Sequence, residues 1–162
     1  MDLFRNIYEI FGLGVNKIYS SNMSSFLAGM EDLCSEPYSG TPLYMFFGIV
    51  MIVSSIFIYA LQYHIIDKPS VSSWKAWWAF AGCAFVFNFG FAFIKMWTLL
   101  SNIPLKFGCD EEFIKVIFNI PDVAMFALVN GILSFIVFIL ISCPPLFRRL
   151  SKNCYKTTLI PH

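Results

Sequence analysis

Charged side chains divide the sequence into long apolar runs. Residues 37–66, 76–94 and 123–147 contain no Asp, Glu, Lys or Arg over 30, 19 and 25 positions respectively. A membrane-spanning helix needs about 20 apolar residues, and an ionised side chain is costly in hydrocarbon. We therefore predict three spans, near residues 43–63, 76–100 and 122–143. Because backbone groups in lipid must pair internally, three spans have to be helices.

The first 41 residues have a different pattern, in which apolar residues recur at steps of three and four. The apolar positions are Phe4, Ile7, Phe11, Val15 and Ile18, and the polar residues Asp2, Arg5, Asn6, Glu9 and Asn16 fall on the other side of such a helix. This periodicity predicts an amphipathic helix that lies in the membrane interface; packing on a partner subunit is the alternative. A short interfacial helix is also predicted at 113–118 in the second loop, where three acidic residues precede it and suit a helix start.

These elements predict an all-α integral membrane protein with three transmembrane helices. We expect an N-terminal amphipathic arm at 1–41, a transmembrane domain at 42–147 and a basic cytoplasmic tail at 148–162. The distribution of basic residues sets the orientation, since cytoplasmic loops are enriched in Lys and Arg. The 64–75 loop and the tail carry six basic residues, and the arm and the 101–121 loop carry four. The N-terminus is therefore predicted outside and the C-terminus in the cytoplasm.

Composition agrees with a membrane protein. Hydrophobic residues make up 58% of the chain and charged residues 13%, whereas soluble domains average about 45–50% and about 25%. These values exclude a soluble globular enzyme and a disordered chain. A net charge of +1 gives no basic field for phosphates, so nucleic acid is excluded as a partner. The expected partners are the lipid bilayer and other membrane subunits, identical or different.

Polar and small residues recur at helical spacing within each predicted span. The polar positions that we expect to pack between helices, or else to line a pore, are Ser55, Gln62, Asn88, Lys95, Asn130 and Ser134. Helices in bilayers associate through small residues and interhelical hydrogen bonds, so these stripes should face protein. Lys95, near the outer end of its span, is expected to reach the interface or to pair with Asp122, with a pore-lining role as the alternative.

Several signals lie outside the spans. Cys34 and Cys109 fall on the same outer side, where a disulfide between them is a possibility. Asn22 begins an Asn-Met-Ser glycosylation sequon. Arg148, Arg149 and Lys152 follow the third span and suit contact with anionic headgroups. The cysteines are too widely spaced to predict a zinc site, and no metal or other cofactor is expected.

The sequence contains no recognisable catalytic set. His64 stands alone at the end of the first span, and the spans lack the several ionisable residues typical of membrane enzymes. We therefore predict a non-enzymatic integral membrane protein that acts as a structural or accessory subunit of a membrane complex through lateral helix–helix association. The alternative is a homo-oligomeric ion channel or pore, with polar residues of the second and third spans lining the lumen.

Overall fold

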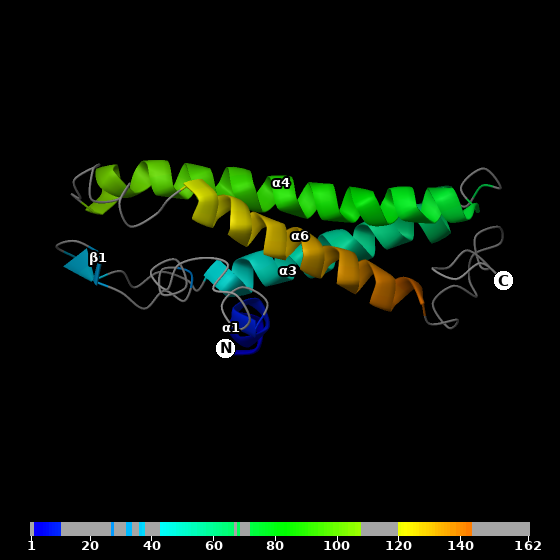
Figure 1. The fold of residues 1–162 in the computed structure, drawn as a ribbon, viewed down its shortest axis with the longest axis horizontal. Helices are drawn as coiled ribbons and strands as arrows, with labels where there is room; N and C mark the ends of the chain where they lie inside the picture. The colour runs from blue at the N-terminus through cyan, green and yellow to red at the C-terminus, as the bar shows by residue number, and fades with distance from the viewer. Residues whose placement is uncertain are drawn as a thin grey trace. The chain divides into compact units, whose positions relative to one another are not determined.

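A computed structural model describes residues 2–10, 27, 32–33, 36–37, 43–66, 68, 72–107 and 120–143 of the chain. Within these residues the elements, in order, are α1 (Asp2–Glu9), β1 (Asp32–Leu33), β2 (Glu36–Pro37), α3 (Leu43–Ala60), η2 (Leu61–Ile66), α4 (Trp74–Phe107) and α6 (Ile120–Ser142), most of which are labelled in Figure 1. β1 and β2 form a two-residue antiparallel pair in which Asp32 lies opposite Pro37. η2 is a π-helix that directly continues α3, and the rest of the described structure is almost entirely helical.

Three helical segments are long and apolar enough to span a membrane: Leu43–Ile66, Trp74–Ser101 and Ile120–Ser142. The prediction of a helical protein with three such helices is thereby confirmed. The observed segments overlap the three predicted ranges. α4 differs most from its predicted range, because the helix continues to Phe107, seven residues beyond the predicted end of the second span.

Local sequence explains where two of these helices begin. Ser73 precedes α4, and its Oγ accepts a hydrogen bond from the backbone N–H of Ala76 at 3.1 Å. This is the contact of an N-cap, which satisfies one of the free N–H groups of the first turn. α6 begins with Ile120, Pro121 and Asp122. Proline is favoured in the first turn and an acidic side chain is stabilised near the positive end of the helix dipole.

The chain divides into two compact units. The first comprises Met1–Ile49 and Phe89–Asn130, and the second comprises Val50–Asn88 and Gly131–His162. The first unit therefore contains α1, the start of α3, the C-terminal part of α4 and the start of α6. The second contains the remainder of these three long helices together with η2.

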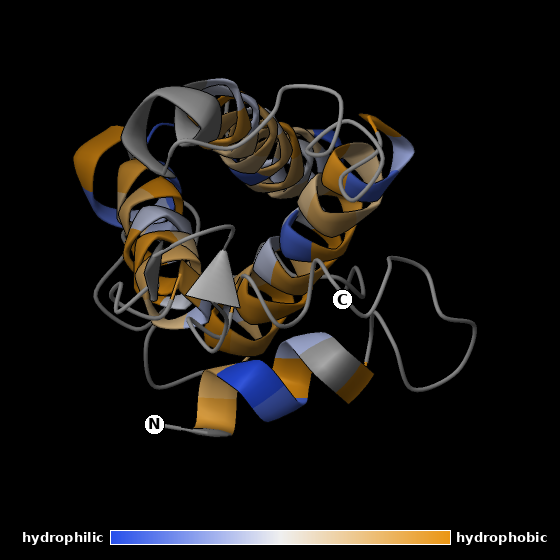
Figure 2. Cartoon of the chain, turned by 90° about the vertical axis from the view of Figure 1, so that its left-hand side faces the viewer, coloured by the Kyte–Doolittle hydropathy of each residue, from blue (hydrophilic) through white to orange (hydrophobic). Residues whose placement is uncertain are grey.

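The N-terminal helix is only partly described. α1 ends at Glu9, so the predicted positions Phe11, Val15 and Ile18 lie outside the described residues. Within α1, Tyr8 is fully buried, Leu3 is exposed and Phe4 is half-buried; Ile10, directly after α1, is also exposed. The side of α1 that contacts protein therefore follows the step of four from Phe4 to Tyr8. Figure 2 shows α1 with hydrophobic and hydrophilic residues side by side, in contrast to the mostly hydrophobic long helices.

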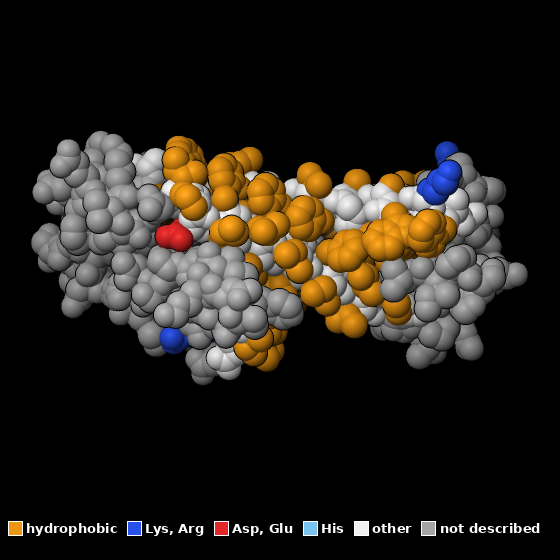
Figure 3. All heavy atoms as spheres, in the orientation of Figure 1, with side chains coloured by type: hydrophobic (Ala, Val, Ile, Leu, Met, Phe, Trp, Pro, Cys, Tyr) orange, Lys and Arg blue, Asp and Glu red, His pale blue; other side chains and the backbone are white. Residues whose placement is uncertain are grey.

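Large apolar side chains cover much of the exposed surface of the long helices. Examples of these exposed residues are Val53, Phe57, Val86, Phe87, Ile94, Trp97 and Leu140. Figure 3 shows hydrophobic side chains across the described part of one face, with few charged groups among them. A surface of this kind suits a surrounding of acyl chains or apolar protein, as expected for membrane-spanning helices.

Candidate functional site

A cluster of four polar side chains joins three helices inside the second unit. Ser54 and Ser55 come from α3, Asn88 from α4 and Ser134 from α6. Ser55, Asn88 and Ser134 are fully buried, and Ser54 is half-buried. We call these four residues the polar cluster.

Asn88 is the centre of the polar cluster. Its Nδ2 donates to the Oγ of Ser134 at 2.7 Å and to the backbone carbonyl of Ala84 at 3.0 Å. Its Oδ1 accepts from the Oγ of Ser54 at 3.0 Å. Reversing the amide would place Oδ1 against the carbonyl oxygen of Ala84, where neither atom can donate. The hydrogen bonds therefore fix the orientation of the amide, and one side chain links α4 to both other helices.

The hydroxyl groups complete the polar cluster. The Oγ atoms of Ser55 and Ser134 lie 3.1 Å apart, and either can donate to the other. Ser134 can also donate to the carbonyl of Ala84 at 3.0 Å, and Ser55 to the carbonyl of Met51 at 2.7 Å. Every donor of the cluster thus has an acceptor within reach, which removes the penalty for burying these groups. Asn and Ser carry no charge, and nothing in the polar cluster acts as a base.

In the first unit, a buried hydrogen bond separate from the polar cluster links α1 to α6. The hydroxyl of Tyr8 donates to the Oδ1 of Asn130, and both side chains are buried. The Tyr8 ring lies 5.5 Å from the ring centroids of both Tyr44 and Phe126. Burial, and to a smaller degree the neighbouring Tyr44, raises the pKa of Tyr8 above the ordinary tyrosine value. The phenol therefore keeps the proton that it donates to Asn130.

α1 also approaches α3 closely at a glycine. A Cβ placed on Gly48 would lie 2.2 Å from Cδ1 of Phe4, a distance at which atoms overlap. Only glycine leaves room for the Phe4 ring at this position. The contacts of Phe4 and Tyr8 therefore dock α1 on the first part of α3 and α6.

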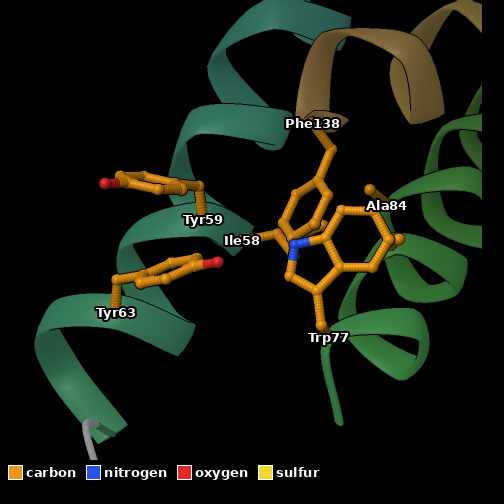
Figure 4. Close-up of a cluster of buried hydrophobic side chains, with 7 residues drawn as sticks. Ile58, Tyr59, Tyr63, Trp77, Ala84 and Phe138 are labelled. Atoms are coloured by element: carbon orange, nitrogen blue, oxygen red, sulfur yellow. The ribbon is translucent and has the colours of Figure 1, made fainter. Parts of the chain in front are cut away.

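A third buried group, in the second unit, is hydrophobic and mainly aromatic (Figure 4). This group, the aromatic cluster, consists of Ile58, Tyr59, Tyr63, Trp77, Ala81, Ala84 and Phe138. The rings of Tyr59 and Tyr63 stack with centroids 4.8 Å apart, and Nε1 of Trp77 donates to the Oγ of Ser142 at 3.3 Å. In Figure 4 the hydroxyl of Tyr63 points toward Trp77, and that of Tyr59 points away.

Gln62 lies on η2 beside the aromatic cluster and is fully buried. In the part of the chain that the structure describes, neither its Nε2 nor its Oε1 has a hydrogen-bond partner. This distinguishes Gln62 from the polar cluster, in which each amide or hydroxyl group is bonded.

Lys95 departs from the stripe in which the sequence placed it. The side chain is exposed, and the next buried position after Ala92 is Met96. The buried row on α4 runs Ala84, Asn88, Ala92, Met96, in steps of four. Each such step advances about 40° beyond a full turn, so the row winds around the helix and leaves Lys95 outside it. Lys95 is therefore not part of the buried row that contains Asn88.

Several predicted positions lie outside the described residues. These are the disulfide candidates Cys34 and Cys109, the sequon residue Asn22, the basic residues Arg148, Arg149 and Lys152, and the helix predicted at 113–118. The remaining predicted stripe residues, Ser55, Gln62, Asn88, Asn130 and Ser134, are all buried.

Tyr8, Ser54 and Ser142 take part in these hydrogen bonds and were not singled out by the sequence analysis. Tyr8 lies one helical turn after Phe4 and so belongs to the same side of α1, which is a signal that the sequence did contain. Ser54 lies beside Ser55 and was passed over in favour of its neighbour. Ser142 sits at the end of α6, where a polar residue suggests only the end of a span.

The described surface includes an apolar groove. A groove of about 310 Å³ is lined by Gly82, Phe85, Val86, Ile132 and Phe135, none of which has a polar side chain. Among the described residues, no group of three His, Cys, Asp or Glu side chains is placed to hold a metal ion.

No family model, no curated protein and no solved structure matches the chain.

Proposed function

We propose that the chain is a non-enzymatic multi-pass membrane protein that serves as a structural or accessory subunit of a membrane complex. It would act through lateral helix–helix association, using its apolar outer surface. The polar cluster is the observation that carries this proposal. Its mid-span amide and hydroxyl groups bond to one another across three helices, so they hold the chain together and are not directed at a substrate.

The outer surface supports the same role. Large apolar side chains are exposed along α3, α4 and α6, and the groove beside Gly82 is apolar. Association between helices in a bilayer depends on close packing more than on hydrophobic attraction. A neighbouring subunit would pack against this surface, with lipid covering what remains.

The pore alternative receives less support. A lumen shared between copies would need Asn88, Asn130 and Lys95 to face it together. Asn88 and Asn130 are buried within the chain, where each already has a hydrogen-bond partner, whereas Lys95 is exposed. A pore would require these buried side chains to turn outward and give up those bonds.

We further propose that α1 lies in the outer membrane interface, with the C-terminus in the cytoplasm. α1 contacts α3 at Tyr44 and Gly48, and Gly48 is five residues, about 7–8 Å, from the start of α3. An interfacial helix buries its apolar side about 5–10 Å into the boundary of the acyl region. The exposed side chains of Leu3 and Ile10 would then contact acyl chains, while Phe4 and Tyr8 contact protein.

Native mass spectrometry of the chain, extracted from its own membrane in a mild detergent, tests the subunit proposal. We expect a mixed assembly that contains this chain at a fixed stoichiometry. A chain that is found only as a monomer, or only as a ring of identical copies, would contradict it.

A conductance measurement separates the pore alternative. Purified protein in planar bilayers should give no conductance if the chain is an accessory subunit. Conductance that changes in a Lys95→Met variant would instead establish a pore in which Lys95 takes part, because this substitution removes the charge and keeps most of the side-chain length.

A further inference from the structure

Among the described residues, Gln62 is the one with buried side-chain polar atoms that have no hydrogen-bond partner. Its relative exposure is 0%, and both Nε2 and Oε1 lack a hydrogen-bond partner. An amide buried without compensating bonds costs about 1–3 kcal/mol by protein measurements, and more in a fully apolar surrounding. A group that remains in this position needs a bonding partner from outside the described chain.

The backbone beside Gln62 is also unusual. α3 changes at Leu61 from an α-helix into the π-helix η2, which continues to Ile66. Such turns are rare, and they are often found at functional sites. Within η2, Gln62 and Tyr63 are buried, whereas His64 and Ile65 are exposed. At this π-helical turn Gln62 is therefore inside the fold, as is its neighbour Tyr63, which belongs to the aromatic cluster.

The amide itself limits what can satisfy it. Gln62 offers two N–H donors and one carbonyl acceptor, so the occupant must both accept and donate. The face of a neighbouring aromatic ring can receive an N–H, yet it would leave Oε1 unpaired. The amide of a second copy has the right complement, but Gln62 is closed off within its own chain. A water molecule both donates and accepts, and it is small enough for a closed site.

We propose that Gln62 is a hydration site, at which the side-chain amide binds an internal water molecule. The site lies four residues from Ile66, the end of the first span, so a water molecule would have only a short distance to cross. Internal waters commonly make about three hydrogen bonds to polar groups that would otherwise be unpaired. This site is independent of the proposed subunit role and of the polar cluster.

Nuclear magnetic resonance of the unmodified protein tests the proposal directly. Gln62 is the only glutamine in the chain, so labelling with ¹⁵N-glutamine gives a single side-chain NH₂ pair. In detergent or nanodiscs we expect cross-peaks from both NH₂ protons to the water resonance, with the sign of a water bound for longer than nanoseconds. A Gln62→Met variant, which removes the amide and keeps the length, assigns the signal by its loss.

Hydroxyl groups exchange protons with water, and one that lies close to the amide can imitate such a cross-peak, so a matched control is needed. Tyr59→Phe and Tyr63→Phe each remove one such hydroxyl and keep the ring. Cross-peaks that persist in both variants support a bound water. Loss of the water cross-peaks in either variant would overturn the proposal, since the signal would then have come from the tyrosine.

Two other results would also overturn the proposal. NH₂ resonances shifted strongly upfield, with no water cross-peak, would identify an aromatic ring as the partner. Cross-peaks between differently labelled copies in a mixed sample would identify a second chain.

Discussion

Asn88→Leu is the substitution that examines the polar cluster most directly. Leucine has a similar size and no hydrogen-bonding groups, so the change removes the bonds and largely keeps the packing. Three hydrogen bonds are lost: those to Ser134, to Ser54 and to the carbonyl of Ala84. Two of the three join different helices.

The expected loss in the free energy of unfolding depends on the hydrogen bonds that Ser54 and Ser134 can still make in the variant. Ser54 can still donate to the carbonyl of Met51 at 3.1 Å, and Ser134 can still donate to the carbonyl of Ala84. Because no donor is orphaned, the additional penalty for an unpaired buried group does not arise. Interhelical bonds in membrane proteins average about 0.6 kcal/mol and reach about 1.7 kcal/mol. Two of them give a loss of about 1–3 kcal/mol in the free energy of unfolding.

A double-mutant cycle isolates the shortest bond. Asn88→Leu, Ser134→Ala and the double variant are unfolded reversibly by adding SDS to protein in mild detergent, with helicity followed by circular dichroism. We expect a coupling energy of about 0.6–1.7 kcal/mol between the two positions. Cys83→Ala, at an exposed position on the same helix, is the control and should change stability by less than about 0.5 kcal/mol. A coupling energy near zero, or an Asn88→Leu variant as stable as the parent, would refute the bonding pattern described above.

Two further predictions concern other contacts, and the same unfolding assay measures both. Tyr8→Phe keeps the ring but removes the proton donated to Asn130, so it should lower the free energy of unfolding by about 1 kcal/mol; an unchanged value would contradict the docking of α1. Gly131→Ala places a Cβ 3.0 Å from the ring of Phe85 and 3.2 Å from its carbonyl oxygen, and should cost about 1–3 kcal/mol. Gly82→Ala meets nothing within 4 Å and should leave stability unchanged or raise it by up to about 1 kcal/mol; equal effects at the two glycines would contradict the packing.

The number and extent of the long helices could be predicted because hydrocarbon leaves few alternatives. A run without charge that exceeds about 20 residues has to be a helix if it enters a bilayer. Among the described residues, the structure has three helical segments that are long and apolar enough to span a membrane, although the second, Trp74–Ser101, includes Lys75 and Lys95. The end of α4 was less predictable, since the rule concerns solvation and does not say where a helix stops once it leaves the apolar region.

The polar stripe shows which buried positions can be predicted from helical spacing and which cannot. Ser55, Asn88 and Ser134 were singled out because polar residues are scarce in spans, and the structure buries all three. Spacing in steps of three and four could not choose between Lys95 and Met96, since both steps fit a straight stripe. The choice depends on how the buried row winds around α4, which neighbouring helices determine. Their packing is not encoded in the period of one helix.

Contacts between distant residues were beyond prediction for a different reason. Tyr8 and Asn130 are separated by 122 positions, and nothing in a single sequence pairs them. Gln62 was expected in the stripe, but the π-helical turn that buries it without a partner has no simple sequence signal. In both cases the sequence indicates a residue that needs a hydrogen bond and leaves the partner open.

The two buried asparagines of the long helices are satisfied in different ways, and this bears on the N-terminal arm. Asn88 bonds to Ser54 and Ser134, which also belong to the long helices. Asn130 instead accepts from Tyr8, which lies on an element outside the candidate spans. A buried amide is costly without its partners, so α1 contributes to the stability of the helices on which it docks. α1 is then a structural part of the first unit, and a change that detaches it should weaken α3 and α6 as well as free the arm.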